Sequence, residues 1–227
     1  MKKLFILLLV ASLSGLMTGC DMDDDGFYLN DAWTGFGLVN KAANSESFTI
    51  EMDDGEVLYP STNSGLVKDV FNNERVLVNF SILGNKENPD HNEYYYVKIN
   101  SLRKILYKGI FDITPAKEDS IGNDPIQVED KWIKKDMLNF ELKYWGGNKT
   151  HFINLVKQPG AINPDNGLVI LELRHNINGD TEEFPFSAFV SFDLRSLKVA
   201  GKNSTSFKVI AKGFDGQDFE YTGEYKY

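Results

Sequence analysis

The sequence has very little of the side-chain chemistry that proteins use to hold metals. It contains one cysteine, Cys20, and three histidines, so it forms no internal disulfide. No His-x-His or His-Glu-x-x-His spacing occurs, and a metal centre needs three or four converging ligands. His151 and His175 fall in expected strands and can be neighbours across a sheet, whereas His91 lies in a polar loop. We therefore expect ordinary strand histidines, no metal and no cofactor.

Sequence patterns that mark catalytic sites are also missing. There is no Gly-x-Ser-x-Gly nucleophile elbow, and Gly35-Phe36-Gly37 lacks the residues that complete a phosphate-binding loop. Acidic side chains are numerous, but Asp and Glu are ordinary surface residues, so they do not define a glycosidase pair. The sequence therefore predicts that the protein is not an enzyme, and a hydrolase ranks third behind two binding functions.

No apolar run is long enough to cross a membrane. The apolar stretch from Leu4 to Met17 is interrupted by two serines and a glycine, and it falls short of the roughly 20 residues that a span needs. Lys2 and Lys3 precede it, and small residues follow. A basic start, a short apolar core and a small-residue cleavage site are typical of a signal peptide, which we assign to residues 1–19. A transmembrane anchor is the alternative.

The end of this leader, Leu16-Met17-Thr18-Gly19-Cys20, resembles a bacterial lipobox, in which the cysteine is lipidated and becomes the mature N-terminus. Met17 departs from the leucine that is usual at that position. Lipid on Cys20 also accounts for a lone thiol, which is a liability when it is exposed. Each buried methylene contributes about 0.8 kcal/mol, so several acyl chains hold a protein to a membrane. We therefore predict a membrane partner through Cys20.

Basic residues are outnumbered, with 24 Lys and Arg against 33 Asp and Glu, and loss of Lys2 and Lys3 with the leader moves the net charge from −9 to −11. The negative electrostatic field of such a chain repels nucleic acid, so no nucleic-acid partner is expected. Asp21-Met22-Asp23-Asp24-Asp25-Gly26 opens a predicted acidic tether over residues 20–30. It also matches the start of a calcium-binding loop, but Ala32 stands where that loop needs Glu. Acidic runs after a lipidated cysteine resemble surface-export signals of Bacteroidota lipoproteins.

Aromatic residues make up 13% of the chain, and apolar and polar residues alternate with a period of two, which favours strands. The strands expected in the first half are Trp33 to Val39, Ser47 to Met52, Glu56 to Tyr59, Arg75 to Ile82 and Glu93 to Asn100, with Ser101 to Tyr107 closing the sheet. Five strands in about 80 residues predict a small barrel over residues 31–113. Ser64 to Asn72 is the one short helix expected.

Turn and helix-breaking residues cluster next, at Thr114-Pro115 and Gly122-Asn123-Asp124-Pro125. We assign a linker to residues 114–125. The strands expected beyond it lie at 126–128, 138–144, 149–156, 168–174, 184–192, 205–212 and 219–225. About seven strands in such a length predict a β-sandwich over residues 126–227. The fold class is therefore all-β.

The lipobox and its Asp run occur together with several distinctive segments. These are Arg75-Val76-Leu77-Val78-Asn79, Tyr95-Tyr96-Val97-Lys98, Asp119-Ser120-Ile121-Gly122, Leu173-Arg174-His175-Asn176 and Phe189-Val190-Ser191-Phe192-Asp193-Leu194. The combination resembles the NigD-like lipoproteins of the Bacteroidota over essentially the whole mature chain. The resemblance implies an N-terminal OB-type barrel and a C-terminal β-sandwich, and a role suggested by a bacteriocin locus, namely immunity. It brings no established catalytic residues.

Tyr94, Tyr96 and Lys98 are the candidate binding residues. Their strand directs Tyr95, Val97 and Ile99 inwards, so the candidates face outwards, where tyrosines can stack on flat ligands or sugar rings. OB-type barrels use such a face for oligosaccharides and oligonucleotides. The alternative, which we favour, is that the tyrosines pack against the second domain.

Trp132, Tyr144 and Trp145 cluster near turns and form either a protein contact surface or packing under a loop. Asp119-Ser120-Ile121 resembles the sequon at which Bacteroidota attach O-glycans, which makes Ser120 a candidate acceptor; a plain polar turn is the alternative. The leading interpretation is a non-catalytic lipoprotein anchored in the outer membrane of a bacterial envelope, with immunity or another protein contact as its function. A glycan-binding surface lipoprotein is the second interpretation.

Overall fold

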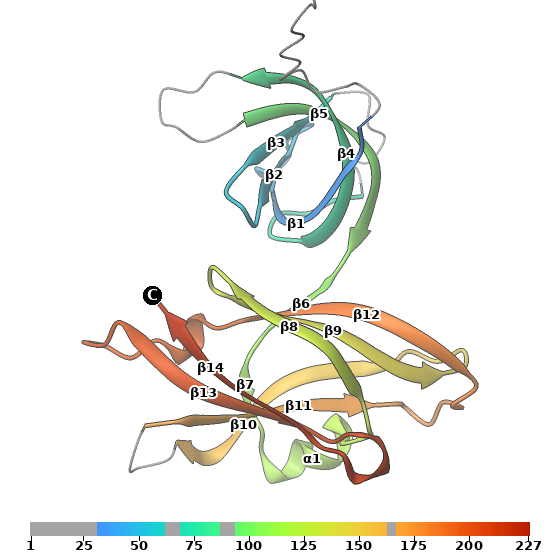
Figure 1. The fold of residues 1–227 in the computed structure, drawn as a ribbon, viewed down its shortest axis with the longest axis vertical. Helices are drawn as coiled ribbons and strands as arrows, with labels where there is room; N and C mark the ends of the chain where they lie inside the picture. Colours follow the sequence, from blue (N-terminus) through green and yellow to red (C-terminus); the bar gives the residue numbers. More distant parts are fainter. Residues whose placement is uncertain (1–30, 62–68, 87–93, 163–166) are drawn as a thin grey trace, which may run out of the picture.

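The computed structural model describes residues 31–61, 69–86, 94–162 and 167–227. The predicted signal peptide, the lipobox, the acidic tether and His91 therefore lie outside the described residues, as does most of the helix expected at Ser64 to Asn72. Figure 1 shows two bodies, a barrel and a sandwich, joined where the chain passes from β5 to β6. The predicted all-β class is confirmed.

The first body is a closed barrel of five strands, which confirms the small barrel predicted from the sequence. Its strands are β1 (Trp33–Asn40), β2 (Thr49–Met52), β3 (Val57–Pro60), β4 (Arg75–Lys86) and β5 (Tyr94–Lys104). Around the barrel they follow the order β1-β2-β3-β5-β4, and β1 pairs with β4 to close it. Apolar residues at alternating positions along these strands point into the barrel. Among them, the fully buried ones include Ile50, Leu58, Val76, Val78 and Val97.

Two glycines in β1 explain the Gly35-Phe36-Gly37 pattern in structural terms. A Cβ at Gly37 would lie 2.5 Å from Cγ2 of Ile50 and 2.9 Å from the carbonyl oxygen of Glu51, and a Cβ at Gly35 would lie 2.7 Å from Cε of Met52. The glycines therefore make room for the side chains of β2 inside the barrel. Phe36, between them, points outwards to the second body.

The chain leaves the barrel earlier than predicted. Ser101 to Lys104 continue β5 and pair with β4, and Ile105 donates its backbone N–H to the carbonyl of Arg75. Residues 106–109 then form β6 (Leu106–Gly109), which pairs with β12 in the sandwich, and β7 (Phe111–Asp112) pairs with β10. The segment expected to close the barrel is thus divided between the two bodies, because its alternation fits either sheet.

The second body is a β-sandwich, as predicted. One sheet has the order β14-β13-β11-β10-β7 and the other the order β6-β12-β9-β8. The remaining strands are β8 (Gln127–Lys134), β9 (Met137–Gly146), β10 (Phe152–Ile162), β11 (Val169–Asn176), β12 (Phe184–Asp193), β13 (Ser204–Ala211) and β14 (Phe219–Lys226). Phe140, Phe192 and Phe207 are completely buried between the sheets. Two 3₁₀ turns, η2 (Arg195–Leu197) and η3 (Phe214–Gly216), precede β13 and β14.

The predicted linker contains a helix, α1 (Pro115–Ile121), where the sequence indicated a loop. Pro115 occupies the first helical turn, where its missing N–H costs nothing, and Glu118 complements the positive helix end. Gly122 ends the helix with a φ of 72°. Buried Ile121 packs with Ile113 and Val156. A helix of two turns is too short to show a helical period, and its Pro and Gly were interpreted as breakers. In the described chain no helix is long and apolar enough to cross a bilayer.

Candidate functional site

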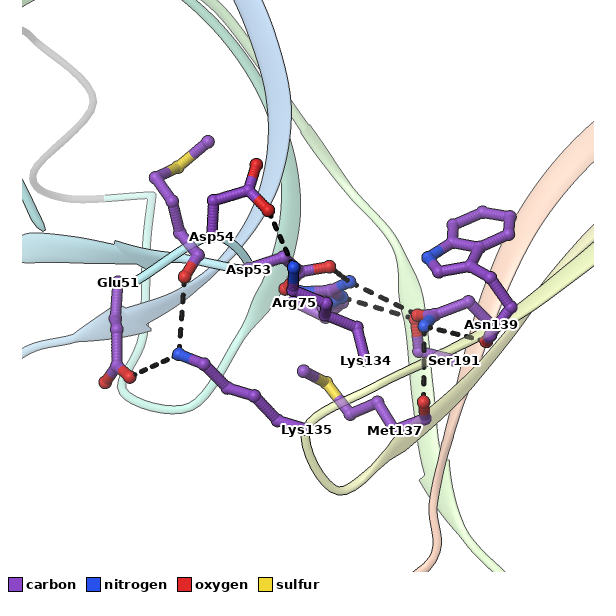
Figure 2. A network of polar contacts seen from close by, with 11 residues as sticks. Glu51, Asp53, Asp54, Arg75, Lys134, Lys135, Met137, Asn139 and Ser191 are labelled. Carbon is purple, nitrogen blue, oxygen red and sulfur yellow. Dashed lines mark hydrogen bonds and ion pairs between the residues drawn. The ribbon is translucent and has the colours of Figure 1, made fainter. Parts of the chain in front are cut away.

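The two bodies meet at a junction centred on Arg75, the first residue of β4 (Figure 2). Its side chain leaves the barrel and reaches the outer face of the four-stranded sheet. Nη1 and Nη2 donate to the two carboxylate oxygens of Asp53 at 2.5 and 2.7 Å. Nε donates to Oγ of Ser191 at 3.3 Å, and Nη2 donates to Oδ1 of Asn139 at 3.2 Å. The Arg75 side chain has no solvent-exposed surface, so a permanent cation is buried between the domains.

The polar groups around Arg75 satisfy one another. Ser191 donates its hydroxyl to Oδ1 of Asn139 at 2.7 Å. Asn139 uses its amide nitrogen to donate to the carbonyls of Trp132 and Met137, both at 3.3 Å. Buried polar groups cost free energy unless they are paired, and a buried cation needs a compensating carboxylate. The network from Asp53 to Ser191 therefore fixes how the barrel sits on the sandwich.

The tip of the β8–β9 hairpin adds outer ion pairs to the junction (Figures 1 and 2). Lys134 Nζ lies 2.7 Å from Oδ1 of Asp54, and Lys135 Nζ lies 2.6 Å from Oε1 of Glu51. The hydrogen bond and the charge of Asp54 raise the pKa of Lys134. All four side chains are 40% or more exposed, and exposed pairs contribute little to stability. They orient the hairpin, whereas Arg75 holds the junction.

Aromatic rings line the junction beside Arg75. The Phe36 ring centroid lies 5.5 Å from that of Trp132 and 5.2 Å from that of Phe189. The Arg75 guanidinium lies over the Phe36 ring, 5.4 Å from its centroid. Trp132 is thus half-buried at the domain junction, whereas Trp145 packs edge-on against Phe214, away from it. The Tyr144 ring lies beside the rings of His151 and His175. The three aromatic residues singled out in the sequence therefore do not form one surface.

An open cleft of about 480 Å³ lies beside these rings and takes residues from both domains. The barrel supplies Gly35, Phe36, Met52, Asp53 and Asp54, and the sandwich supplies Asp130, Trp132, Lys134, Glu141 and Phe189. Four of these residues are acidic and one is basic. The sequence does not predict this cleft, because its residues come from five strands and the β2–β3 turn, and no local pattern gives the relative register of those strands.

The predicted residues Tyr94, Tyr96 and Lys98 lie on the outside of β5. Tyr96 is 47% exposed, Lys98 is exposed, and Tyr94 is half-buried. Tyr59 of β3, which no local signal indicated, lies beside them, with ring centroids 5.6 Å from Tyr94 and 6.0 Å from Tyr96. The ring contacts of this tyrosine face (Tyr59, Tyr94 and Tyr96) in the described part lie within the barrel. Whether it binds a ligand stays a prediction.

His151 and His175 are neighbours, as the sequence suggested. His175 Nδ1 lies 2.9 Å from the carbonyl oxygen of Pro125, so that nitrogen must donate. His175 Nε2 then accepts from His151 Nδ1 at 2.9 Å, and His151 Nε2 lies 3.2 Å from Oδ2 of Asp180. This assignment follows from the hydrogen-bond partners.

The surroundings of this histidine chain shift the pKa values of two of its groups, His175 and Asp180. Burial lowers the pKa of His175. Burial by itself raises the pKa of Asp180, but four backbone N–H groups, those of Gly147, Thr181, Asn148 and Lys149, bring it well below its usual range. No group of three or more His, Cys, Asp and Glu side chains in the described chain is placed to hold a metal. The arrangement is a buried structural chain that joins β10 to β11.

Ser120, the candidate glycan acceptor, is exposed on α1, where its Oγ donates to the carbonyl of Lys117 at 2.8 Å. Its place on a helix rather than in an open linker differs from expectation. Attachment of a glycan there stays a prediction.

The fold and the junction define a two-domain all-β protein in which a closed barrel is locked onto the outer face of a sandwich. The family model for the NigD-like N-terminal OB domain matches residues 36–105, and the family model for the NigD-like C-terminal beta sandwich domain matches residues 109–225. The chain belongs to the NigD-like family. The OB-type barrel and the C-terminal β-sandwich expected from the resemblance are therefore confirmed.

Solved structures of proteins from Parabacteroides and Bacteroides share this fold. A protein of Parabacteroides distasonis described as toxin related is 29% identical, with a TM-score of 0.69 over 86% of this chain and 94% of that one. A NigD-like immunity protein of Bacteroides caccae is 24% identical, with a TM-score of 0.65 over 88% and 99%. A protein of Bacteroides fragilis described as a lipoprotein is 14% identical, with a TM-score of 0.63 over 87% and 98%. No curated protein matches the chain.

Proposed function

We propose that this protein is a lipid-anchored lipoprotein of the bacterial envelope that acts by binding a protein partner and catalyses no reaction. The observation that carries the proposal is the cleft between the domains, whose walls the buried Arg75 network holds in place. Binding sites are typically concave, preformed and placed where domains meet. The immunity role named for the Bacteroides caccae protein supports a protein contact as the function.

Anchoring is assigned to Cys20, in the outer membrane, with the acidic residues 20–30 as the spacer to the barrel. Replacing Cys20 by Ser removes the lipid attachment atom. We expect Cys20→Ser to move the protein from the membrane fraction to the soluble fraction, or to leave the leader uncleaved. Equal retention of the variant and the wild type in the membrane fraction would contradict lipid anchoring.

Binding is tested by capture from the envelope fraction of the producing cell, or of a bacteriocin-producing competitor, with the whole lipidated protein as bait. We expect one protein to be enriched by the wild type and lost with Trp132→Ala, because that change removes one of the three rings that form the aromatic wall of the cleft. Tyr221→Ala is the matched control: it also removes a half-buried sandwich aromatic but lies outside the cleft. Equal capture by all three baits would overturn the proposal.

Glycan binding on the tyrosine face is the second candidate function. The observation that favours it is the addition of Tyr59 to the predicted Tyr94 and Tyr96, which gives a row of three rings across β3 and β5. Rings of this kind can stack on sugars, and outward faces of OB-type barrels bind oligosaccharides.

A further inference from the structure

We infer that the cleft between the domains binds a cationic side chain, an arginine, which the partner protein inserts between the aromatic wall and the carboxylates Asp130 and Glu141. The inference rests on the proposed function for the source of the arginine. It rests on the structure for the chemistry of the site.

The cleft side of the four-stranded sheet carries two adjacent rows of side chains. In one row Trp132 pairs with Asn139, and Asn139 pairs with Ser191. In the next row Asp130 pairs with Glu141, and Glu141 pairs with Phe189. Directly opposed residues point to the same face of a sheet, so both rows face the barrel. The first row holds the guanidinium of Arg75.

The second row has charge but no cation. Asp130 and Glu141 face each other across β8 and β9, an arrangement that destabilises a sheet. Within the described chain neither carboxylate forms an ion pair. Asp130 accepts a hydrogen bond only from the backbone N–H of Lys131, at 2.8 Å. The Glu141 carboxylate accepts no hydrogen bond from any described residue. A β-bulge between Val128 and Asp130 sets this register, and bulges commonly re-aim side chains beside functional sites. A positive ligand would relieve the repulsion.

Arg75 shows the kind of cation that this surface accepts. Its guanidinium binds Asp53 through two parallel hydrogen bonds and lies over the Phe36 ring. Planar guanidinium groups both stack on aromatic rings and bind carboxylates through paired donors, which an ammonium group does less well. The Trp132 and Phe189 rings and the two free carboxylates offer the same combination one row away.

The contrast with a neighbouring cleft supports this choice. A cleft of about 490 Å³ contains Glu51, Lys135, Asp136 and Arg195, and its charges are paired. Lys135 pairs with Glu51, Lys198 reaches Asp136 at 3.3 Å, and Arg195 pairs with Asp193. Of these two clefts, only the first combines an open aromatic wall with carboxylates that lack an ion pair in the described chain. The net charge of −9 also draws a basic partner.

The test uses ¹⁵N-labelled full mature protein in detergent micelles, with acetyl-arginine amide as the probe. The protein has three tryptophans, so the indole N–H signal of Trp132 can be assigned with one Trp132→Phe variant. We expect acetyl-arginine amide to shift this signal saturably, and its neutral isostere acetyl-citrulline amide to shift it at least tenfold more weakly. Equal shifts with both probes, or no shift of Trp132 with arginine, would overturn the inference.

Two variants locate the site. Asp130→Asn with Glu141→Gln should weaken binding of the arginine probe about tenfold or more, while the melting temperature stays equal or rises because the like charges are gone. Glu129→Gln, which changes the residue beside Asp130 but lies outside the cleft, should leave binding unchanged. Undiminished binding by the double variant would place the arginine elsewhere and contradict the inference.

The same double variant separates this inference from the proposed function. If the variant captures the partner as well as the wild type does, the protein contact stands and the arginine site is wrong. If no partner is captured but the probe binds to Trp132, the arginine site stands and the proposed function is wrong.

Discussion

His175 shows at the scale of one residue how burial couples protonation to folding. Burial lowers its pKa in the folded state, below the ordinary value of about 6.5 for an unfolded chain. The unfolded state therefore binds a proton first as the pH falls. This contribution to stability is complete above pH 6.5 and is lost as the pH drops through 6.5 towards the folded pKa, with a slope of at most about 1.4 kcal/mol per pH unit.

The measurement is the urea midpoint between pH 8 and pH 5, for the wild type and His175→Gln. We expect a fall towards acid in the wild type and a shallower fall in the variant, which keeps a side-chain donor for the Pro125 carbonyl. The lowered pKa of Asp180 acts in the same direction, but only at more acidic pH. Identical slopes for the two proteins would show that His175 is not the titrating group.

Gly37 tests packing at a single position. A Cβ there would meet Ile50 and a backbone oxygen of Glu51 at contact distances that proteins do not tolerate. Gly37→Ala should destabilise the protein by roughly 1–3 kcal/mol through strain in the barrel. Gly84→Ala is the matched control in β4, because nothing lies within 4 Å of its added Cβ. Similar urea midpoints for both variants would contradict the close approach of β1 to β2.

At the scale of elements, variants in β5 can show whether the tyrosine face binds a glycan or only packs as part of the structure. Its inward residues, Tyr95 and Val97, are buried, so Tyr94→Ala with Tyr96→Ala should leave folding nearly intact. If a glycan stacks there, the double variant loses affinity by about 1–3 kcal/mol per ring. The readout is binding of the protein to a glycan array beside its melting curve. A clear drop in melting temperature would make the tyrosines structural, and they would then be withdrawn as site residues.

Alternation explains which elements the sequence could predict. Strands with one apolar face, such as Val76 to Ile82 and Leu138 to Tyr144, carry a period of two that survives any tertiary context. Helix α1 does not, because two turns give no period and its Pro115 and Gly122 serve as start and stop. The β5–β6 boundary was also missed, since strand polarity says nothing about which sheet a strand joins.

At the scale of the whole molecule, the junction could not have been found from the sequence. Arg75 is read as one more polar residue at the start of a strand, yet its partners Asn139 and Ser191 lie 64 and 116 residues away. The cleft has the same property, because cross-strand register alone brings Asp130, Glu141 and Phe189 together. The residues that were predicted, Tyr94, Tyr96 and Lys98, share one strand and therefore one local pattern.

The central claim is that Arg75 joins the barrel and the sandwich into one body, which makes the cleft a fixed surface. The most direct measurement is hydrogen exchange along a urea series, followed separately in peptides from β1–β5 and from β8–β12. In the wild type both sets should lose protection at one midpoint. In Arg75→Met the free energy of unfolding of the barrel should fall by about 3–5 kcal/mol, because Asp53 is left without its cation, and the sandwich should keep its midpoint. The control variant Lys134→Ala should change neither midpoint. Separate midpoints in the wild type, or a common midpoint in Arg75→Met, would contradict the account.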